Sequence, residues 1–134
     1  MPRLAVGAVV IETRQDGPYV LLARRGRPPR EGQWSLPGGK LEERETLVAG
    51  VAREVLEETG LEVRVEKLVE VVEIIDESFH YVILDYLCTP IGGTLKAGDD
   101  CAEVQWVAVY DVGEYDVTAA VRRVVSMAIS DERE

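Results

Sequence analysis

The chain has 134 residues, the size of one domain, and 46% of them are apolar, which is enough for one hydrophobic core. Asp and Glu (25) outnumber Lys and Arg (15), so the formal net charge of −10 disfavours nucleic acid and anionic membranes as partners. No apolar run approaches the roughly 20 residues that a membrane-spanning helix needs, which excludes that class of protein.

Apolar periodicity and turn residues divide the chain into strands and helices, with strands in the majority. The predicted strands cover residues 4–12, 19–25, 63–75, 80–89 and 103–110, and the predicted helices cover 47–59 and 117–130. Residues 26–40, rich in Pro and Gly, are predicted to form a loop. This order predicts a single α+β domain over 1–134, with helices packed on an antiparallel or mixed sheet.

The predicted helix 47–59 has a recognisable start, end and core face. Thr46 is a suitable N-cap, and Gly60 is suited to the position just after the last turn. At about 100° per residue, one side of the helix carries small and β-branched side chains. These core candidates are Val48, Val51, Ala52, Val55 and Thr59. The opposite flank carries Gly50 and the acidic residues of the helix.

Glu54, Glu57 and Glu58 converge on that flank at a cost in helix stability. Each like-charge pair three or four residues apart costs a few tenths of a kcal/mol, and Gly50 costs about 1 kcal/mol relative to alanine. One interpretation is an acidic face exposed to solvent, although such faces normally contain lysine and this helix has none. The other is a site for a divalent cation, because clustered carboxylate oxygens suit Mg²⁺ or Mn²⁺. The helix alone leaves both interpretations open.

Residues 39–61 read GKLEERETLVAGVAREVLEETGL and resemble the signature of the Nudix hydrolase family. The fixed residues of that signature are matched by Gly39, Glu45, Arg53, Glu54, Val55, Glu57, Glu58, Gly60 and Leu61. The preceding GQWSLPGG (32–39) is also similar to the family's segment at this place. The resemblance covers essentially the whole chain. It implies an α/β/α sandwich around a mixed sheet, with the signature forming a loop, a helix and a loop.

The resemblance also implies an activity, the hydrolysis of a diphosphate linkage in a nucleoside diphosphate derivative with Mg²⁺ or Mn²⁺. It assigns metal binding to Glu54, Glu57 and Glu58, with Gly38 allowing close backbone approach, and gives Glu57 and Glu58 catalytic roles as well. Bound metal neutralises phosphate charge and lowers the pKa of its water. It also explains how a chain with a net charge of −10 tolerates an anionic substrate.

Two further residues are expected to take part in catalysis. Arg53 can pair with Glu57 and Glu45 and so orient the metal ligands, the alternative being an ordinary surface ion pair. Glu103 begins a predicted strand at a place where relatives often carry a metal-binding or basic glutamate, and it is the first candidate for the general base. The alternative for Glu103 is a surface carboxylate at the edge of a strand. Its loop neighbours Asp99 and Asp100 are weaker candidates.

Candidate substrate contacts lie outside the signature. Arg24 and Arg25, in the segment RRGRPPR (24–30), are expected to contact phosphate, because guanidinium groups bind phosphate bidentately; a solubilising loop is the alternative. Trp34, Phe79 and Tyr81 are candidates for stacking on a base, although each also suits the core or its rim. The single histidine, His80, is interpreted as structural.

ADP-ribose is the favoured substrate, cleaved to AMP and ribose 5-phosphate, because residues 80–107 resemble small prokaryotic members grouped with ADP-ribose pyrophosphatases. Against it, Asp76 and Glu77 stand where many such enzymes have proline. The alternatives are hydrolysis of oxidised nucleoside triphosphates and a non-catalytic module that binds nucleotide or cation, a type that typically loses signature glutamates. Homodimers are frequent among relatives. Free Cys88 and Cys101 without a signal peptide predict a cytoplasmic protein.

Overall fold

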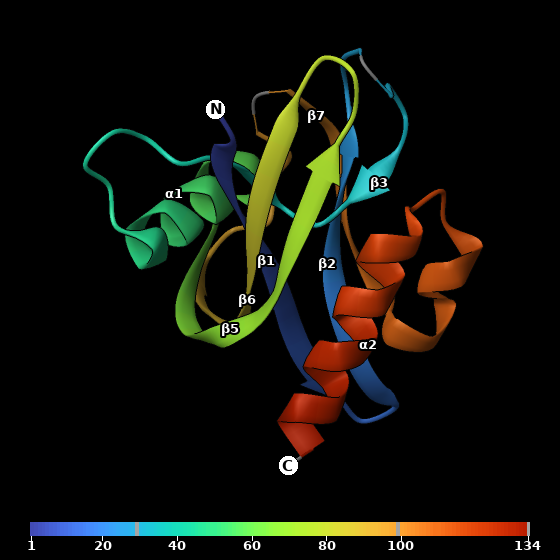
Figure 1. The fold of residues 1–134 in the computed structure, drawn as a ribbon. Coiled ribbons are helices and arrows are strands. Elements are labelled where there is room, and N and C mark those ends of the chain that lie inside the picture. Colours follow the sequence, from blue (N-terminus) through green and yellow to red (C-terminus); the bar gives the residue numbers. More distant parts are fainter. Residues whose placement is uncertain (29, 99, 134) are drawn as a thin grey trace.

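The computed structural model describes residues 1–28, 30–98 and 100–133, and it consists of a mixed sheet with a helix on each face (Figure 1). The strands are β1 Arg3–Arg14, β2 Gly17–Arg25, β3 Trp34–Ser35, β4 Gly38–Lys40, β5 Leu61–Ile75, β6 His80–Gly93 and β7 Cys101–Ala108. The helices are α1 Leu47–Thr59, a 3₁₀ helix Val109–Glu114 and α2 Ala119–Arg133. The predicted α+β class is confirmed.

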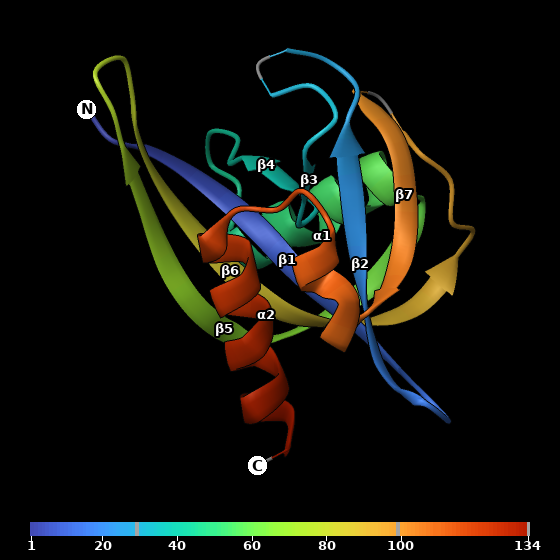
Figure 2. The ribbon, with the colours of Figure 1, turned by 90° about the vertical axis from the view of Figure 1, so that its right-hand side faces the viewer.

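β1 organises the sheet, since its two halves pair with different partners. Its first half runs parallel to β6, Arg3–Val10 against Tyr81–Cys88, and its residues Ala5–Gly7 pair antiparallel with β4 on the other side. Its last residues pair with β2, which continues the sheet to β3 and β7. β5 and β6 form a long antiparallel hairpin at the other edge (Figure 2).

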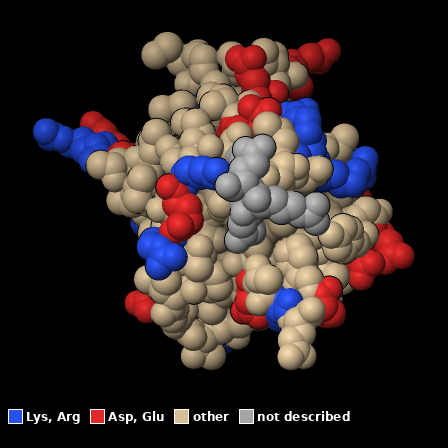
Figure 3. All heavy atoms as spheres, turned by 90° about the horizontal axis from the view of Figure 1, so that it is seen from below, with Lys and Arg blue, Asp and Glu red and all other residues tan. Residues whose placement is uncertain are grey.

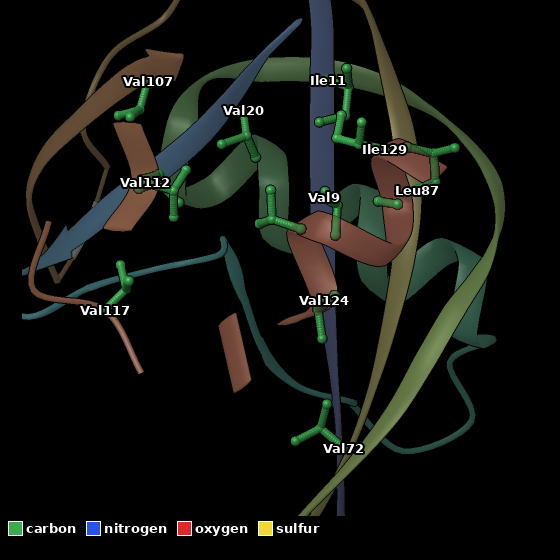
Figure 4. Packing of buried hydrophobic residues seen from close by; sticks show 13 residues of the cluster. Val9, Ile11, Val20, Val72, Leu87, Val107, Val112, Val117, Val124 and Ile129 are labelled. Carbon is green, nitrogen blue, oxygen red and sulfur yellow. The ribbon is translucent and has the colours of Figure 1, made fainter. Parts of the chain in front are cut away.

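Two hydrophobic clusters hold the helices to the sheet. On one face, Val9 and Ile11 of β1 pack with Val124, Val125 and other apolar residues of α2, as the close view in Figure 4 shows. On the other face, Val6, Ala8 and Val10 pack with residues of α1. Neighbouring residues of β1 therefore face different helices. This double burial is why the strand reads as a continuous apolar run rather than an alternating one.

α1 begins and ends where the sequence predicted. The Thr46 side chain accepts a hydrogen bond from the Ala49 N–H at 3.1 Å, and Gly60 has φ 78° in the left-handed region. The core face was only partly predicted, because Val48 is 51% exposed whereas Gly50 is buried. A Cβ at residue 50 would lie 2.7 Å from Leu41 Cδ1, so the loop before the helix covers that position and moves the buried stripe towards it.

The predicted loop over 26–40 is interrupted by β3 and β4. β3 has 2 residues and β4 has 3, too few for a hydrophobic period to appear in the sequence. Their pairing depends instead on β2 and β1, which lie close only in the folded chain.

The surface carries charges of both signs. The space-filling view in Figure 3 shows Lys and Arg interspersed with Asp and Glu over the face around the C-terminal end of α2, without a continuous basic area on that face. Within the described residues, no helix has the length and apolarity needed to cross a bilayer.

Candidate active site

The glutamates of α1 line a cleft together with arginines at the end of β2 and just after it. The cleft has a volume of about 680 Å³. Its acidic lining includes Glu54, Glu57 and Glu58, and its basic lining includes Arg24, Arg25, Arg27 and Lys40. The structure thus brings together the three predicted metal ligands and both predicted phosphate contacts. A cleft with clustered carboxylates and clustered guanidinium groups suits an anion that is bridged by a cation.

Arg53 is the centre of the ion-pair network beneath the cleft. Its guanidinium makes two hydrogen bonds to Glu45, Nε to Oε2 at 2.6 Å and Nη2 to Oε1 at 2.9 Å. Nη1 donates to Glu54 at 2.8 Å and to Glu57 at 3.3 Å, and Nη2 also donates to the Lys40 carbonyl oxygen at 3.1 Å. The side chain is 21% exposed. Arg53 therefore ties the preceding loop to two of the three glutamates. Its pairing with Glu45 and Glu57 was predicted from the sequence, whereas its hydrogen bond to Glu54 was not.

Glu45 is held ionised by this network. The hydrogen bonds from Arg53, together with the backbone N–H of Glu42, lower the pKa of Glu45 to about 2. Its carboxylate also lies near Gly50, where a Cβ would come within 3.1 Å of Oε1. The glycine within the helix therefore gives room to the loop glutamate that positions Arg53.

Glu58 is partly buried, and both of its carboxylate oxygens accept hydrogen bonds. The Gly38 N–H donates to its Oε1 at 2.9 Å, and the Cys101 thiol donates to its Oε2 at 3.5 Å. Burial, with a smaller contribution from the Glu54 carboxylate, raises the pKa of Glu58 to about 7. Burial and Glu58 in turn raise the pKa of Cys101 to about 12, so this thiol stays protonated and can donate.

Two glycines of β4 set the position of these carboxylates. A Cβ at Gly39 would lie 2.6 Å from the Glu54 carboxylate, so only glycine fits beside it. A Cβ at Gly38 would overlap the Val6 carbonyl oxygen of β1. Gly38 thus has a structural role that the sequence did not reveal, in addition to the N–H that orients Glu58. Its expected place next to the metal stays a prediction.

The donor set of the cleft fits a hard divalent cation. Among the described residues, no three acidic, His or Cys side chains are already arranged as a closed metal site. Glu54 and Glu58, however, place two carboxylates close enough for one to raise the pKa of the other. Glu57 has a side chain that is 57% exposed and makes one long contact with Arg53. A cation between these oxygens would relieve the repulsion of two like charges.

Glu103 pairs with a residue of the cleft, and its expected role as the general base stays a prediction. β2 and β7 place it opposite Arg24, and its Oε1 is 3.2 Å from Arg24 Nη2 with 47% of the side chain exposed. It is therefore engaged with a phosphate-contact candidate and not with the glutamates of α1. Asp100 does line the cleft and pairs with Arg27 at 2.9 Å, whereas Asp99 lies outside the described residues.

The three aromatic candidates for base stacking have other partners. The Trp34 ring packs edge-on against Tyr115, with centroids 5.3 Å apart, and lies 5.8 Å from the Arg24 guanidinium. Phe79 and Tyr81 pack on each other at 5.3 Å near the end of the β5–β6 hairpin. None of the three is among the described residues that line the cleft. His80 pairs with Glu73 at 2.9 Å in the same hairpin, consistent with a structural role.

A second cavity adjoins the cleft and was not anticipated from the sequence. It has a volume of about 250 Å³ and shares Ser35, Leu36, Gly38 and Gly39 with the cleft as lining residues. It also contains Asp85 of β6, a residue that is 6% exposed. Burial, with a smaller effect of Glu70, raises the pKa of Asp85 to about 7. The sequence feature that could have indicated this buried carboxyl is an aspartate inside the apolar run YVILDYLC (81–88).

Comparison with known proteins matches the chain to one domain family and to proteins named as pyrophosphatases or diphosphatases. The chain matches the model of the NUDIX domain over residues 1–127. It is similar to an ADP-ribose pyrophosphatase of Methanocaldococcus jannaschii, with 36% identity over 107 residues, 78% of this chain and 61% of that protein. It is also similar to the putative 8-oxo-dGTP diphosphatase 2 of Mycobacterium tuberculosis, with 56% identity over 61 residues, 45% of this chain and 40% of that protein.

A crystal structure of a MutT NUDIX hydrolase from Burkholderia pseudomallei shares the fold. It superposes with a TM-score of 0.82 at 31% identity, covering 95% of this chain and 98% of that one. The chain spans less than two thirds of the length of both sequence relatives, 61% and 40%.

Proposed function

Because this chain belongs to the Nudix hydrolase family, we propose that it hydrolyses the diphosphate linkage of a nucleoside diphosphate derivative, with ADP-ribose as the favoured substrate. The observation that carries the proposal is the cleft itself, in which Glu54, Glu57 and Glu58 share one space with Arg24 and Arg25. Carboxylates suit the cations that bridge phosphate oxygens, and guanidinium groups bind the oxygens directly. A predicted cytoplasmic location and a homodimer accompany this proposal.

In the proposed reaction, the residues in and beneath the cleft have three different roles. Glu54, Glu57 and Glu58 would hold Mg²⁺ or Mn²⁺, which when bound neutralises phosphate charge and lowers the pKa of water. Arg53 keeps Glu54 and Glu57 in place through its hydrogen bonds of 2.8 and 3.3 Å. Arg24 and Arg25 would bind the phosphate oxygens and orient the linkage.

Three outcomes of a substrate panel separate the alternatives. The panel contains ADP-ribose, other nucleoside diphosphate derivatives and oxidised deoxynucleoside triphosphates, each with Mg²⁺ and with Mn²⁺ and with products identified. Release of AMP and ribose 5-phosphate from ADP-ribose supports the favoured substrate. Release of a monophosphate from an oxidised triphosphate supports the runner-up, which the 56% identity to a putative 8-oxo-dGTP diphosphatase favours. Tight metal binding without any hydrolysis indicates a non-catalytic module.

Mg²⁺ should raise the melting temperature of the nucleotide-free protein. The cation binds the folded form, where Glu54 and Glu58 lie together, and therefore stabilises it by mass action. At a concentration 100 times the dissociation constant, the gain in the free energy of unfolding is about 2.7 kcal/mol. Thermal melts of the wild type and of Glu58→Gln, with Mg²⁺ from zero to about 10 mM to allow for a weak site, measure the shift in melting temperature. An equal shift in the wild type and in Glu58→Gln would contradict this binding site.

Substitution of Glu103 distinguishes water activation from the positioning of Arg24. The 3.2 Å ion pair leads us to expect that Glu103→Gln mainly raises KM, because Arg24 loses the partner that holds it beside the cleft. We expect kcat to fall by less than about ten-fold, below the 10²–10⁴-fold range that general base catalysis contributes. Steady-state kinetics with the substrate that the panel identifies give both constants. A fall of kcat within that range at unchanged KM would instead support Glu103 as the base.

A further inference from the structure

The cavity next to the cleft contains a carboxyl group that the proposed chemistry does not use. Its volume is about 250 Å³, and most of its lining side chains are apolar. The apolar ones include Leu36, Val72, Ile74, Ile83 and Val121. Because Ser35, Gly38 and Gly39 line both spaces, a molecule with its phosphates in the cleft can extend into this cavity.

Asp85 lines this cavity, and its carboxyl group receives no hydrogen bond from the described residues of the chain. The residue is 6% exposed. Its neighbour across the parallel β1–β6 pair is Gly7, where a Cβ would overlap Asp85 Oδ1. Among the described residues no fully buried side-chain oxygen lacks a hydrogen-bond partner, so the Asp85 oxygens are reached from the cavity. A largely buried carboxyl that receives no hydrogen bond from the chain lowers the free energy of unfolding. Asp85 therefore has an acceptor oxygen that only a ligand or solvent can satisfy.

The other polar groups of the cavity are engaged within the chain. The Ser35 hydroxyl donates to the Leu36 carbonyl oxygen at 3.4 Å, and the Thr118 hydroxyl accepts from the Val121 N–H at 3.2 Å. A mainly apolar cavity with a small number of polar groups is a common arrangement in small-molecule sites, where those groups fix orientation and select the ligand. Here a flat heterocycle can pack against the apolar lining residues, and an N–H group on its edge can donate a hydrogen bond to Asp85.

We propose that this cavity takes the base of the nucleotide whose phosphates occupy the cleft, and that Asp85 selects bases with an exocyclic amino group by accepting a hydrogen bond from it. The proposal rests on the proposed function for the position of the phosphates. The ionised carboxylate offers two acceptor oxygens and no donor, so it can accept from an amino group but cannot hydrogen-bond a carbonyl oxygen. Adenine carries such a group, whereas hypoxanthine has a carbonyl oxygen in its place and would face Asp85 with another acceptor.

Binding of AMP and IMP tests this selection without requiring hydrolysis. With Mg²⁺ present and at a pH well above the pKa of Asp85, which is about 7, calorimetry should show AMP binding more tightly than IMP by about 5- to 100-fold, the range for one good base contact. In Asp85→Leu, which replaces both oxygens by methyl groups, the ratio should fall to near one. Asp85→Asn has both an acceptor oxygen and an N–H donor, which can serve adenine and hypoxanthine alike, so the ratio should also fall. Asp111→Leu, at an exposed position of the 3₁₀ helix, is the matched control and should leave the ratio unchanged.

The stability of the ligand-free variants provides a second measurement. If the Asp85 carboxyl is unsatisfied, Asp85→Leu or the smaller Asp85→Ala should melt at or above the temperature of the wild type, because a buried unpaired group is removed. Loss of the fold in both variants would overturn the inference, since it would show that the carboxyl holds the structure together. Equal affinity of the wild type for AMP and IMP would also overturn it, as would a preference for AMP that survives in Asp85→Leu.

The inference and the proposed function fail in different ways. If ADP-ribose is hydrolysed but the AMP to IMP ratio does not depend on Asp85, the proposed function stands and the role of Asp85 is wrong. If none of the substrates in the panel is hydrolysed but the ratio collapses in Asp85→Leu, Asp85 selects the base of a nucleotide that the protein binds without cleaving.

Discussion

Replacement of Glu57 by glutamine should lower kcat by at least about 100-fold, more than the 10- to 100-fold typical of residues that only support metal ligands. A neutral amide is a poor ligand for Mg²⁺, which prefers charged oxygen donors. The fold should survive, because the Glu57 side chain is 57% exposed and, within the part of the chain that the structure describes, its side chain pairs with Arg53 alone, at 3.3 Å. Turnover at saturating Mg²⁺ should be measured together with the circular dichroism melt of the same preparation.

A matched control separates this effect from the loss of one negative charge. Glu62 is also exposed, but it lies on β5 just after the helix, and Glu62→Gln should keep the wild-type rate. Glu57→Gln with near-normal turnover would remove Glu57 from the set of metal ligands and leave Glu54 and Glu58 as a two-carboxylate site. A melting temperature far below that of the wild type would instead show that Glu57 is needed for the fold.

Local sequence signals predicted α1 well because the forces that define it are local. The Thr46 cap, the left-handed Gly60 and the glutamate flank all depend on residues within a few positions of one another. The same holds for the β5–β6 hairpin, because the predicted strands 63–75 and 80–89 leave residues 76–79 as its loop. Val48 was placed wrongly because the covering residue, Leu41, belongs to a loop whose path no periodicity describes.

The features that the sequence did not reveal depend on pairing between distant parts of the chain. Glu103 faces Arg24 across β2 and β7, although 79 positions separate them in the sequence. Asp85 reads as a break in an apolar strand until the parallel pairing with β1 places Gly7 beside it. A single sequence contains the residue types of such contacts but not the strand register that brings them together.

Arg53 is expected to be the most sensitive position outside the metal ligands, and Arg53→Lys should lower activity by about 10- to 100-fold. A lysine ammonium is a single point of charge and cannot bond both oxygens of Glu45 while reaching Glu54 and the Lys40 carbonyl oxygen. The Mg²⁺ concentration for half-maximal activity should rise as well, because Glu54 and Glu57 lose their orientation. Steady-state rates over a Mg²⁺ titration measure both effects.

The same substitution should alter the acid stability of the protein. Arg53 is the main cause of the lowered pKa of Glu45, about 2 instead of 4.5, so their ion pair stabilises the fold above pH 4.5 and is lost as the pH falls towards 2. Arg53→Lys should therefore weaken the dependence of unfolding on pH in that window. Arg64→Lys, at an exposed arginine paired with Glu66 on β5, is the control and should change neither measurement. If Arg53→Lys keeps full activity and an unchanged Mg²⁺ dependence, the network stabilises the loop before α1 without positioning the ligands.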